Sequence, residues 1–427
     1  MTARNLSWRG DAVAVAQVNT ATIGGTILVT DTVSITINNK TLTVVTGSTI
    51  AATVAATVVA AWNALNATLA PEFGEITAAQ VGWTAAFTLT ADTPGRPFTI
   101  AAATATNSTT ITAAPFTATV ANAGPNDAST IANYQDTTTP LSPADRLPAT
   151  GDTLTIDNTA SSLLYGLSAL SGVTLAGLTI TGTFAGTIGL PNVNAGGYYE
   201  YRPKTLAVGA TVCDIGIGAG NGSGRIKINF GSVQTATTVW NAGSPAENNI
   251  PAVLLAGTHA SNTLAVLKGA VGSAFFAGDV STWASVKLGY VSSPAGDANV
   301  LLGSGATLTA IVQGGGNLNL QSAFTTLTQE SGIVTIGGAA TGTTLTIGGT
   351  LIDQSSGIFT TVNLDGIYDH SKSLTPKTIT TLNAYKKSVY NDPYHVVTLT
   401  NGMALAGDCL PGDVTLNVMP GRTLTIA

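Results

Sequence analysis

A short alternation of polar and apolar residues returns through the second half of the chain. The phrase Thr-Leu/Ile/Val-Thr recurs at intervals of 17 to 19 residues, usually close to a turn that contains glycine. Five copies, the fourth with Asn in its last position, lie at 307–309, 326–328, 344–346, 361–363 and 378–380. A short and nearly constant period is typical of a coil that stacks on itself, with aliphatic residues inside and Thr, Ser and Asn outside. The pattern therefore predicts a β-solenoid.

Similar phrases extend this prediction toward the N-terminus. They lie at 153–156, 173–175, 178–180, 318–320 and 334–336. We therefore predict a short-rung β-solenoid, or β-helix, over residues 151–427. The stretch around 191–278 breaks the rhythm and is rich in aromatic residues, so we expect an irregular insertion there. Since stacked strands lie about 4.8 Å apart, roughly fifteen rungs would form a rod of about 70 Å.

The first third of the chain has a different pattern. Residues 33–37 alternate apolar and polar, and residues 41–45 return as the second arm of a hairpin. The intervening Asn38-Asn39 suits a tight turn because Asn tolerates positive φ. From 50 to 69, apolar residues recur at steps of three and four, which predicts a helix of about six turns with Ser48 as its N-cap.

Further strands complete this first module. They are expected at 87–90, 98–100 and 116–120, with a type II turn at Pro94-Gly95 between the first two. The predicted fold is therefore mainly β. An α+β module, a sheet with one helix, occupies residues 1–135 and serves in assembly or in covering one end of the solenoid. Residues 136–150, rich in Thr, Pro and Asp, form a linker to the solenoid.

The composition predicts a surface that favours association with other protein chains. Charged residues make up 9% of the chain, against about 25% in a typical soluble domain. Charge normally keeps protein surfaces apart, so we expect a homo-oligomer or a subunit of a larger assembly. The net charge of −6, with only 16 scattered Lys and Arg, argues against nucleic-acid binding. Residues 41–70 carry no charge but contain Asn and several Thr, so no membrane span is expected.

Candidate chemistry is sparse. His259, His370 and His395 are isolated from one another in the sequence, so we predict neither a metal site nor a cofactor. Asp365 and Asp369 lie near His370, where they would bind a cation, act as acid and base, or be solvated corner residues. No catalytic motif stands out, and the protein is predicted not to be an enzyme. We expect the cysteines, Cys213 and Cys409, to be buried free thiols, although sequence leaves open whether they pair.

One aromatic cluster is the best binding candidate. Tyr198, Tyr199 and Tyr201 would stack on sugar rings, and Arg202 would hydrogen-bond to the hydroxyl groups of the sugar. The alternative is that these rings fill a junction between the rungs and the insertion. The predicted ligand is a host surface glycan.

Two groups of phrases resemble known proteins. The opening Trp8-Arg9-Gly10-Asp11-Ala12, followed by Ala16-Gln17-Val18, resembles a module of bacteriophage tail and virion proteins and of related planctomycete proteins. Residues 61–63 and 71–77 match further parts of that module. Residues 189–191 and 197–203 are similar to phage-associated and planctomycete β-solenoids. The resemblance implies a structural role in a particle or fibre and offers no catalytic residues.

These observations predict a structural protein of a phage virion or tail. It would be a fibre-like or spike-like homotrimer that partners other virion subunits and contacts the host. The opening lacks the apolar core of a secretory signal, which favours assembly in the host cytoplasm and a final place in the virion. The alternative is a bacterial extracellular filament or a surface adhesin. A polysaccharide-degrading tailspike is a weaker alternative.

Overall fold

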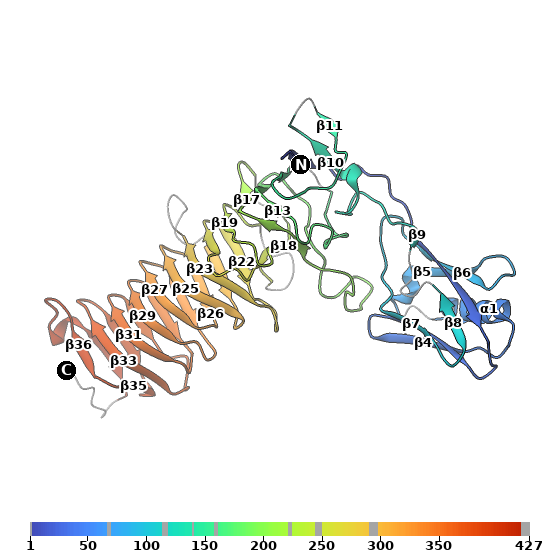
Figure 1. Cartoon of the computed structure of the whole chain (residues 1–427). Helices are drawn as coiled ribbons and strands as arrows, with labels where there is room; N and C mark the ends of the chain where they lie inside the picture. Colours follow the sequence, from blue (N-terminus) through green and yellow to red (C-terminus); the bar gives the residue numbers. More distant parts are fainter. Residues whose placement is uncertain are drawn as a thin grey trace.

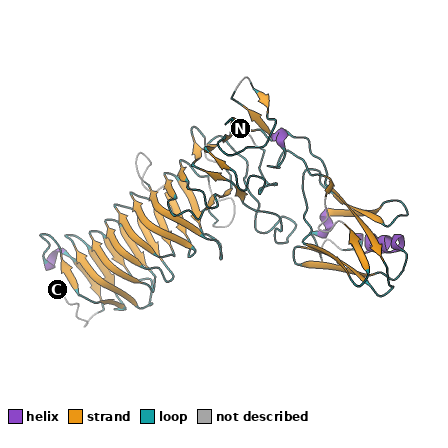
Figure 2. Ribbon diagram, viewed as in Figure 1, coloured by secondary structure: helices purple, strands orange, loops and turns teal. Residues whose placement is uncertain are grey.

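The chain folds into a long rod of stacked strands with a smaller module beside one end (Figure 1). The computed structural model describes residues 2–65, 70–112, 118–138, 141–157, 161–220, 224–243, 250–289 and 298–419. Strands dominate both parts, and helices are few and short (Figure 2). The predicted fold class is confirmed: the protein is mainly β, with an α+β module and a β-solenoid.

The rod consists of two long sheets, and from β17 to β35 successive strands alternate between them. In the described part of the chain, the larger sheet has sixteen strands, whose bounds follow in pairing order. They are β11 (Ser142–Pro143), β10 (Tyr134–Asp136), β1 (Asn5–Trp8), β12 (Thr153–Ile156), β14 (Gly177–Thr181), β17 (Val212–Ile217), β19 (Ala236–Val239), β21 (Thr263–Val266), β23 (Ser281–Leu288), β25 (Ala306–Gln313), β27 (Phe324–Gln329), β29 (Gly342–Ile347), β31 (Ile358–Leu364), β33 (Lys377–Ala384) and β35 (Val397–Leu399), with β36 (Met403–Leu405) also paired to β33.

The smaller sheet has eleven strands among the same described residues. They are β15 (Leu206–Ala207), β18 (Ile226–Asn229), β20 (Val253–Ala256), β22 (Gly269–Ser273), β24 (Ala298–Leu302), β26 (Asn317–Leu320), β28 (Ile333–Ile336), β30 (Thr350–Asp353), β32 (Ile367–Asp369), β34 (Val389–Asp392) and β37 (Thr415–Val418). A short pair, β13 (Thr174–Leu175) and β16 (Gly209–Ala210), stands beside them, and η3 (Pro411–Asp413) lies near the C-terminal end.

Buried side chains form continuous ladders through the rod. In the best-defined ladder, each residue is the register partner of the next: Leu6, Leu154, Leu178, Cys213, Thr237, Leu264, Val286, Ile311, Leu327, Leu345, Val362, Leu382 and Met403. All of them are buried. At about 4.8 Å per level, these thirteen levels span roughly 60 Å. The hydrophobic effect along these ladders is the main stabilising contribution to the rod.

The repeat phrase predicted the rungs, but two of its five copies lie out of register. The copies at 326–328, 344–346 and 361–363 stack directly on one another. The partner of Leu327 is Ile311 rather than Leu308, and the partner of Val362 is Leu382 rather than Ile379. Each of these strands has two inward positions three residues apart. The central residue of the phrase occupies the second of them in the three middle copies and the first of them in the first and last copies.

The second buried position forms its own ladder, which contains large rings. Leu308 is paired with Phe324, and Phe359 is paired with Ile379. Gly342 lies between the two Phe residues, whose ring centroids are 6.3 Å apart. A Cβ atom on Gly342 would come within 2.6 Å of the Phe324 ring, so glycine leaves the room that the rings occupy.

The irregular insertion is shorter than the predicted stretch of 191–278. Between residues 206 and 273, every strand except β16, which pairs with β13, continues the rungs of the two long sheets. Among the described residues of the predicted insertion, the part from 191 to 205 leaves the rod as a long loop, closed at its base by a hydrogen bond from the Leu190 N–H to the Lys204 carbonyl (2.9 Å). Aromatic residues do not mark a break in the rungs, because some of them lie on the outer surface of regular rungs. Trp240 is 43% exposed and donates a hydrogen bond to Asp214 (2.8 Å).

The N-terminal strand belongs to the rod, which differs from the predicted division at residue 135. Strand β1 pairs in parallel with β12, and β10 pairs antiparallel with β1. Trp8 begins one ladder, and its ring meets that of Tyr134 edge to face at 5.3 Å. The module is therefore inserted between β1 and β10. Strands β10 and β11 cover this end of the rod, and Pro143 in the edge strand hinders further pairing.

The described part of the predicted linker, residues 136–138 and 141–150, packs against the first rungs. Its Arg146 forms an ion pair with buried Asp152 at 2.5 Å, and Asp152 also accepts a hydrogen bond from the Arg4 N–H. The segment therefore contributes to the end of the rod instead of joining two independent parts.

The module packs one helix against two small sheets. Strands β5 (Ile76–Gln80), β6 (Ala86–Ala91), β2 (Val18–Gly25), β8 (Thr109–Thr112) and β9 (Ala118–Val120) form one sheet. Strands β4 (Lys40–Val45), β3 (Thr32–Ile37) and β7 (Ala102–Ala105) form the other. Helix α1 (Ala51–Asn63) buries Val54, Ala55, Val58 and Trp62 against them. Two 3₁₀ turns follow, η1 (Phe73–Glu75) and η2 (Ile131–Asn133).

The predicted hairpin is confirmed, with Asn38 at φ 56° between β3 and β4. The helix is shorter than predicted, 13 residues long, and residues 66–69 of the predicted span lie outside the described residues. Its N-cap is Ile50, because the Ser48 hydroxyl instead accepts a hydrogen bond from the Ile50 N–H. The strand expected at 98–100 is irregular, and the start of the strand expected at 116–120 lies outside the described residues. In the described part of the chain, no helix is long and apolar enough to cross a membrane.

The ladder can be tested in the middle of the rod. Replacing fully buried Leu345 by Ala should lower the free energy of unfolding by about 2–5 kcal/mol, because it leaves a cavity between two rungs. Thr346→Ala, at the next and exposed position, is the matched control and should change it by less than about 0.5 kcal/mol. Urea unfolding followed by circular dichroism measures both. Equal effects of the two substitutions would contradict the assigned facing of the strand.

Candidate functional site: a charged joint and an adjacent groove

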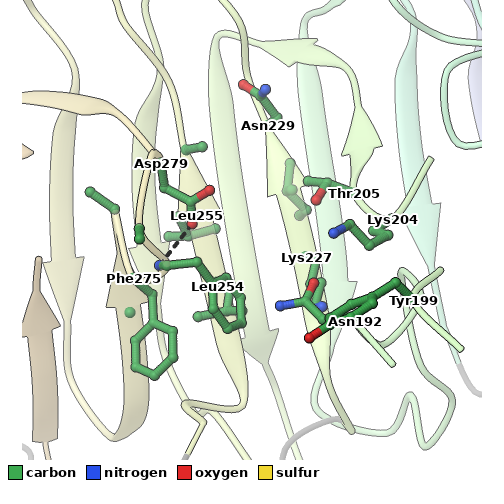
Figure 3. A pocket seen from close by; sticks show the side chains of 16 residues that line it. Asn192, Tyr199, Lys204, Thr205, Lys227, Asn229, Leu254, Leu255, Phe275 and Asp279 are labelled. Atoms are coloured by element: carbon green, nitrogen blue, oxygen red, sulfur yellow. Dashed lines mark hydrogen bonds between the residues drawn. The ribbon is translucent and has the colours of Figure 1, made fainter. Parts of the chain in front are cut away.

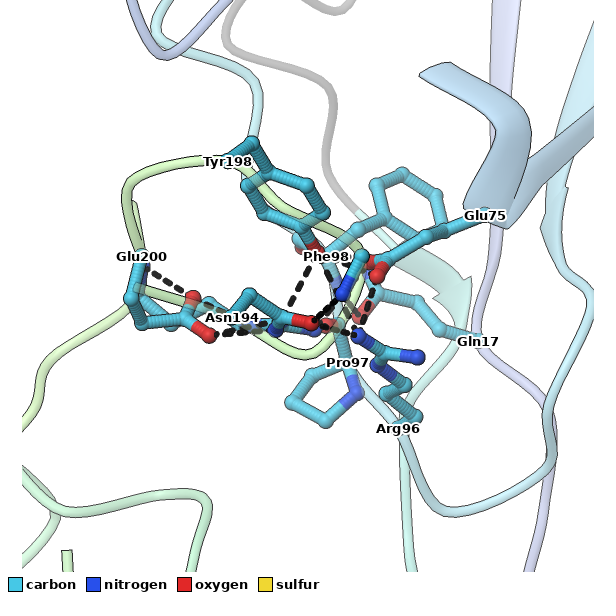
Figure 4. A network of polar contacts seen from close by, with 10 residues as sticks. Gln17, Glu75, Arg96, Pro97, Phe98, Asn194, Tyr198 and Glu200 are labelled. Carbon is cyan, nitrogen blue, oxygen red and sulfur yellow. Dashed lines mark hydrogen bonds and ion pairs between the residues drawn. The ribbon is translucent and has the colours of Figure 1, made fainter. Parts of the chain in front are cut away.

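The loop that leaves the rod meets the module in a network of polar contacts (Figure 4). Tyr198, Glu200 and Arg202 come from the rod loop. Glu75, the last residue of η1, and Arg96, which follows the turn at Gly95, come from the module. We call these five residues the joint.

Arg202 is the cation at the centre of the joint. Its guanidinium donates to both carboxylate oxygens of Glu200, at 2.7 and 2.9 Å, and to the Pro97 carbonyl at 3.1 Å. It also forms an ion pair with Glu75 at 3.4 Å. Burial by itself would lower the pKa of Arg202, but hydrogen bonding to Glu200 and the nearby negative charges outweigh it, so the pKa lies above its usual value. The charge is therefore retained although the side chain is buried.

Glu75 holds the module side of the joint. It pairs with Arg96 and with Arg202, and it accepts a hydrogen bond from the Tyr198 hydroxyl. Burial, reinforced by Glu75, raises the pKa of Tyr198, so this hydroxyl stays protonated and donates. On the rod side, burial would raise the pKa of Glu200, but hydrogen bonds from Arg202 and Asn194 lower it overall. The Glu200 carboxylate is therefore ionised where it meets Arg202.

Two tyrosine rings enclose the same guanidinium. The Cζ atom of Arg202 lies 4.9 Å from the centroid of Tyr201 and 5.5 Å from that of Tyr165. Cation–π contacts of this kind gain strength when the cation is desolvated. A further contact, from the Asn38 side chain to the Tyr199 carbonyl at 3.4 Å, ties the module hairpin to the same loop. The joint therefore fixes the module against the rod at several points.

The structure gives three of the four predicted site residues a place in this junction. Tyr198 and Arg202 are buried, and Tyr201 is half-buried against Arg202. The rings therefore fill a junction, but it is the junction of the rod loop with the module and not the expected one between the rungs and the insertion. Tyr199 differs, because its side chain is 71% exposed. Binding of a glycan by these residues stays a prediction, and Tyr199 is the one with an accessible ring.

Tyr199 lies at one side of a groove of about 380 Å³ on the outer face of the smaller sheet (Figure 3). Lys227 and Leu254 form part of its floor, and Phe275 and Asp279 stand on the opposite side from Tyr199. The remaining lining residues are Asn192, Lys204, Thr205, Ile228, Asn229, Leu255, Ala256, Gly272, Ala274, Phe276 and Ala277.

The groove combines aromatic surfaces with hydrogen-bonding groups. The Lys227 ammonium donates to the Leu190 carbonyl at 2.8 Å and lies 5.7 Å from the Phe276 ring centroid. Asn192, Lys204 and Asp279 add an amide, an ammonium and a carboxylate. This set suits a ligand that is rich in hydroxyl groups. Phe275 and Phe276 belong to the aromatic-rich stretch that was expected to be an insertion, and nothing in the sequence brings residues 199 and 275 together.

The other sequence candidates do not form a site. Asp365 is exposed, and Asp369 accepts hydrogen bonds from the Ser371 N–H and the Asn391 side chain. His370 faces inward and is fully buried. Both cysteines are buried and free, and Cys213 occupies a ladder position. In the described part of the chain, no group of three or more His, Cys, Asp or Glu residues could hold a metal ion.

The chain matches no protein-family model, and no curated protein and no solved structure is significantly similar to it. The resemblance to virion proteins therefore rests on its phrases alone. Two of those phrases meet in space: residues 71–77 supply Glu75, and residues 197–203 supply Tyr198, Glu200 and Arg202.

The joint predicts a strong effect of Arg202→Ala. The substitution leaves Glu200, whose side chain is fully buried, without its cation, and should cost about 3–5 kcal/mol in the attachment of the module. Limited proteolysis should then release the module from an intact rod, and thermal unfolding should split into two transitions. Lys386→Ala, which breaks a more exposed ion pair with Asp413, is the control and should leave both readouts unchanged. A wild-type cleavage pattern in Arg202→Ala would contradict the role given to the joint.

Proposed function

We propose that the chain is a non-enzymatic structural protein of a bacteriophage virion or tail, a fibre-like or spike-like β-solenoid. The observation that carries the proposal is a rod with a module held against one end by a buried charged joint. The phrases that resemble virion proteins supply both halves of that joint. A rod with a fixed module suits a structural protein that holds one component of a virion at a set distance and orientation from another component.

The placement of the charged groups supports a structural role. Arg202 and Glu200 are buried in the joint, and Asp353, His370 and Lys377 are buried in the rod. Such groups stabilise contacts within the chain, and a large substrate has no access to them. The groove beside Tyr199 suits binding more than bond cleavage, because its one carboxylate, Asp279, already accepts a hydrogen bond from the Phe276 N–H at 3.0 Å.

The outer face of the larger sheet supports self-association into a homotrimer. One row of outward residues follows the register from Thr155 through Thr179, Asp214, Thr238, Ala265, Lys287, Val312, Thr328, Thr346, Asn363 and Asn383 to Ala404. Only Asp214 and Lys287 in this row are charged. A flat face with so little charge offers few groups that repel a second copy.

Assembly is tested by electron microscopy and light scattering of the purified chain. We expect trimeric rods with a module at one end of each. Thr328→Lys together with Thr346→Lys should dissociate them, because like charges would then face one another across the interface. The exposed substitution Thr258→Lys, near the smaller sheet, is the control. Open filaments would favour a bacterial surface filament, and monomers alone would contradict the assembly proposal.

Contact with the host is tested on the groove. Binding to a panel of purified capsular and cell-wall polysaccharides should weaken roughly two- to tenfold in Tyr199→Ala, since stacking on an aromatic ring contributes about 0.5–1.5 kcal/mol. Trp83→Ala removes another exposed ring, 90% accessible and in the module, and should have no effect. Absence of binding to every glycan would contradict the host contact, and cleavage of any glycan would favour the tailspike alternative.

A further inference from the structure

A cluster of ionisable groups lies inside the rod near its C-terminal end, between Asp353 in β30 and Lys377 in β33. Asp353 takes a position that is aliphatic one level earlier, where its register partner is Ile336. Asp353, Ser355 and His370 are fully buried, and Lys377 is 2% exposed. Neither the joint nor the groove uses these residues, and the inference drawn from them is independent of the proposed function.

Lys377 and Asp353 face each other in this cluster. The Lys377 Nζ atom lies 3.5 Å from Asp353 Oδ2 and donates a hydrogen bond to the Ser355 hydroxyl at 2.6 Å. The same nitrogen lies 3.2 Å from the centroid of the Phe359 ring. Burial lowers the pKa of Lys377 to about 8, although Asp353 opposes this shift, so an appreciable fraction of the amine is uncharged near neutral pH. An uncharged amine is a nucleophile.

The Asp353 carboxyl group is held by neutral donors. Tyr368 donates to Oδ2 at 2.8 Å, and Ser355 donates to Oδ1 from its N–H at 3.0 Å and from its hydroxyl at 2.7 Å. Burial raises the pKa of Tyr368 well above its usual value, so its hydroxyl keeps its proton. These donors fix the carboxyl group and would stabilise negative charge that develops on its oxygen atoms.

His370 completes the arrangement. Its Nε2 atom lies 3.0 Å from the Thr375 carbonyl, which only accepts, so Nε2 carries the hydrogen. Its Nδ1 atom is buried without a hydrogen-bond partner and lies 3.8 Å from Asp353 Oδ2. An imidazole nitrogen in this position can take a proton from the amine side and return it to the carboxyl oxygen.

We propose that Lys377 and Asp353 condense into an intramolecular isopeptide bond. The Lys377 amine attacks the Asp353 carboxyl carbon, and a new N–C bond forms while negative charge collects on Oδ1, to which the Ser355 N–H and hydroxyl donate. The nitrogen loses a proton, which His370 relays to Oδ2, the departing carboxyl oxygen. The C–O bond to that oxygen breaks and one water molecule leaves. An ammonium and a carboxylate thus become an amide and water, with no oxidant, reductant or cofactor.

The geometry favours this step over a permanent ion pair. The Lys377 nitrogen is already in contact with the Asp353 carboxyl group, 3.5 Å from Oδ2, so little movement brings it to the carboxyl carbon. Both side chains are buried, so water that would otherwise solvate the two charges is excluded. The bond would join Lys377, the first residue of β33, to Asp353, the last residue of β30, and so link the two sheets across the core near the C-terminal end of the rod.

Mass spectrometry of the purified wild-type chain tests the bond. The intact mass should be lower by one water molecule than the sequence requires, and protease fragments carrying Asp353 and Lys377 should remain joined. A succinimide at Asp365-Gly366 also loses one water, but hydroxylamine opens it and it joins no fragments. Full mass in the native wild-type protein after prolonged incubation, with separate fragments, would overturn the proposal.

Variants locate the reaction. Lys377→Met and Asp353→Ala should each restore the full mass, whereas Lys372→Met, an exposed lysine nearby, should leave the linked fragment in place. In freshly synthesised protein, His370→Gln should slow the loss of water at least tenfold without preventing it. If a core variant fails to fold, the wild-type measurement still decides. A linked fragment that persists in Lys377→Met would equally contradict the assignment.

Discussion

The structure depends on the parallel, in-register pairing of one rung with the next. In such a sheet, a shift of a single residue moves every buried side chain to the outer face. The ladder from Leu6 to Met403 keeps its facing through all its levels, so each rung constrains its neighbours. Two departures, Gln313 and Gln329, are accommodated by local hydrogen bonds that replace the lost apolar contact. Gln313 and Gln329 lie in a ladder between Leu288 and Ile347, and their amide groups donate to the Gly316 and Gly332 carbonyls at 2.8 and 3.0 Å.

The same constraint explains where the few charges lie. The inward ladders are mostly apolar, and the row of outward positions on the larger sheet is mostly Thr and Asn. Charged pairs therefore lie where the regular stacking of rungs ends or is interrupted. Arg146 with Asp152 lies at the first rungs, Arg202 with Glu200 and Glu75 at the joint, and Lys377 with Asp353 near the last rungs. A chain that uses its charges internally keeps an outer surface that suits assembly.

Much of the module and rod could be predicted because local patterns specify them. Alternation in residues 33–37 and the Asn38 turn gave the hairpin, and the spacing of Val54, Val58 and Trp62 gave the helix. Its length was overestimated because apolar spacing continues past the residues that form hydrogen-bonded turns. The candidate site was found in part: the phrase at 198–202 was recognised as unusual, but its partners Glu75 and Arg96 lie more than a hundred residues away along the chain.

By itself, the sequence determined the β-solenoid, the facing of its middle rungs and a weakly charged surface, since each follows from residues a few positions apart. Only the tertiary structure decided the place of β1 in the rod, the register of the first and last repeat copies, and the meeting of Tyr199 with Phe275 across a groove. It also decided that Asp353 and Lys377 face each other inside the core. These features arise from contacts between distant segments, and a short period in the sequence carries no information about which distant residues will meet.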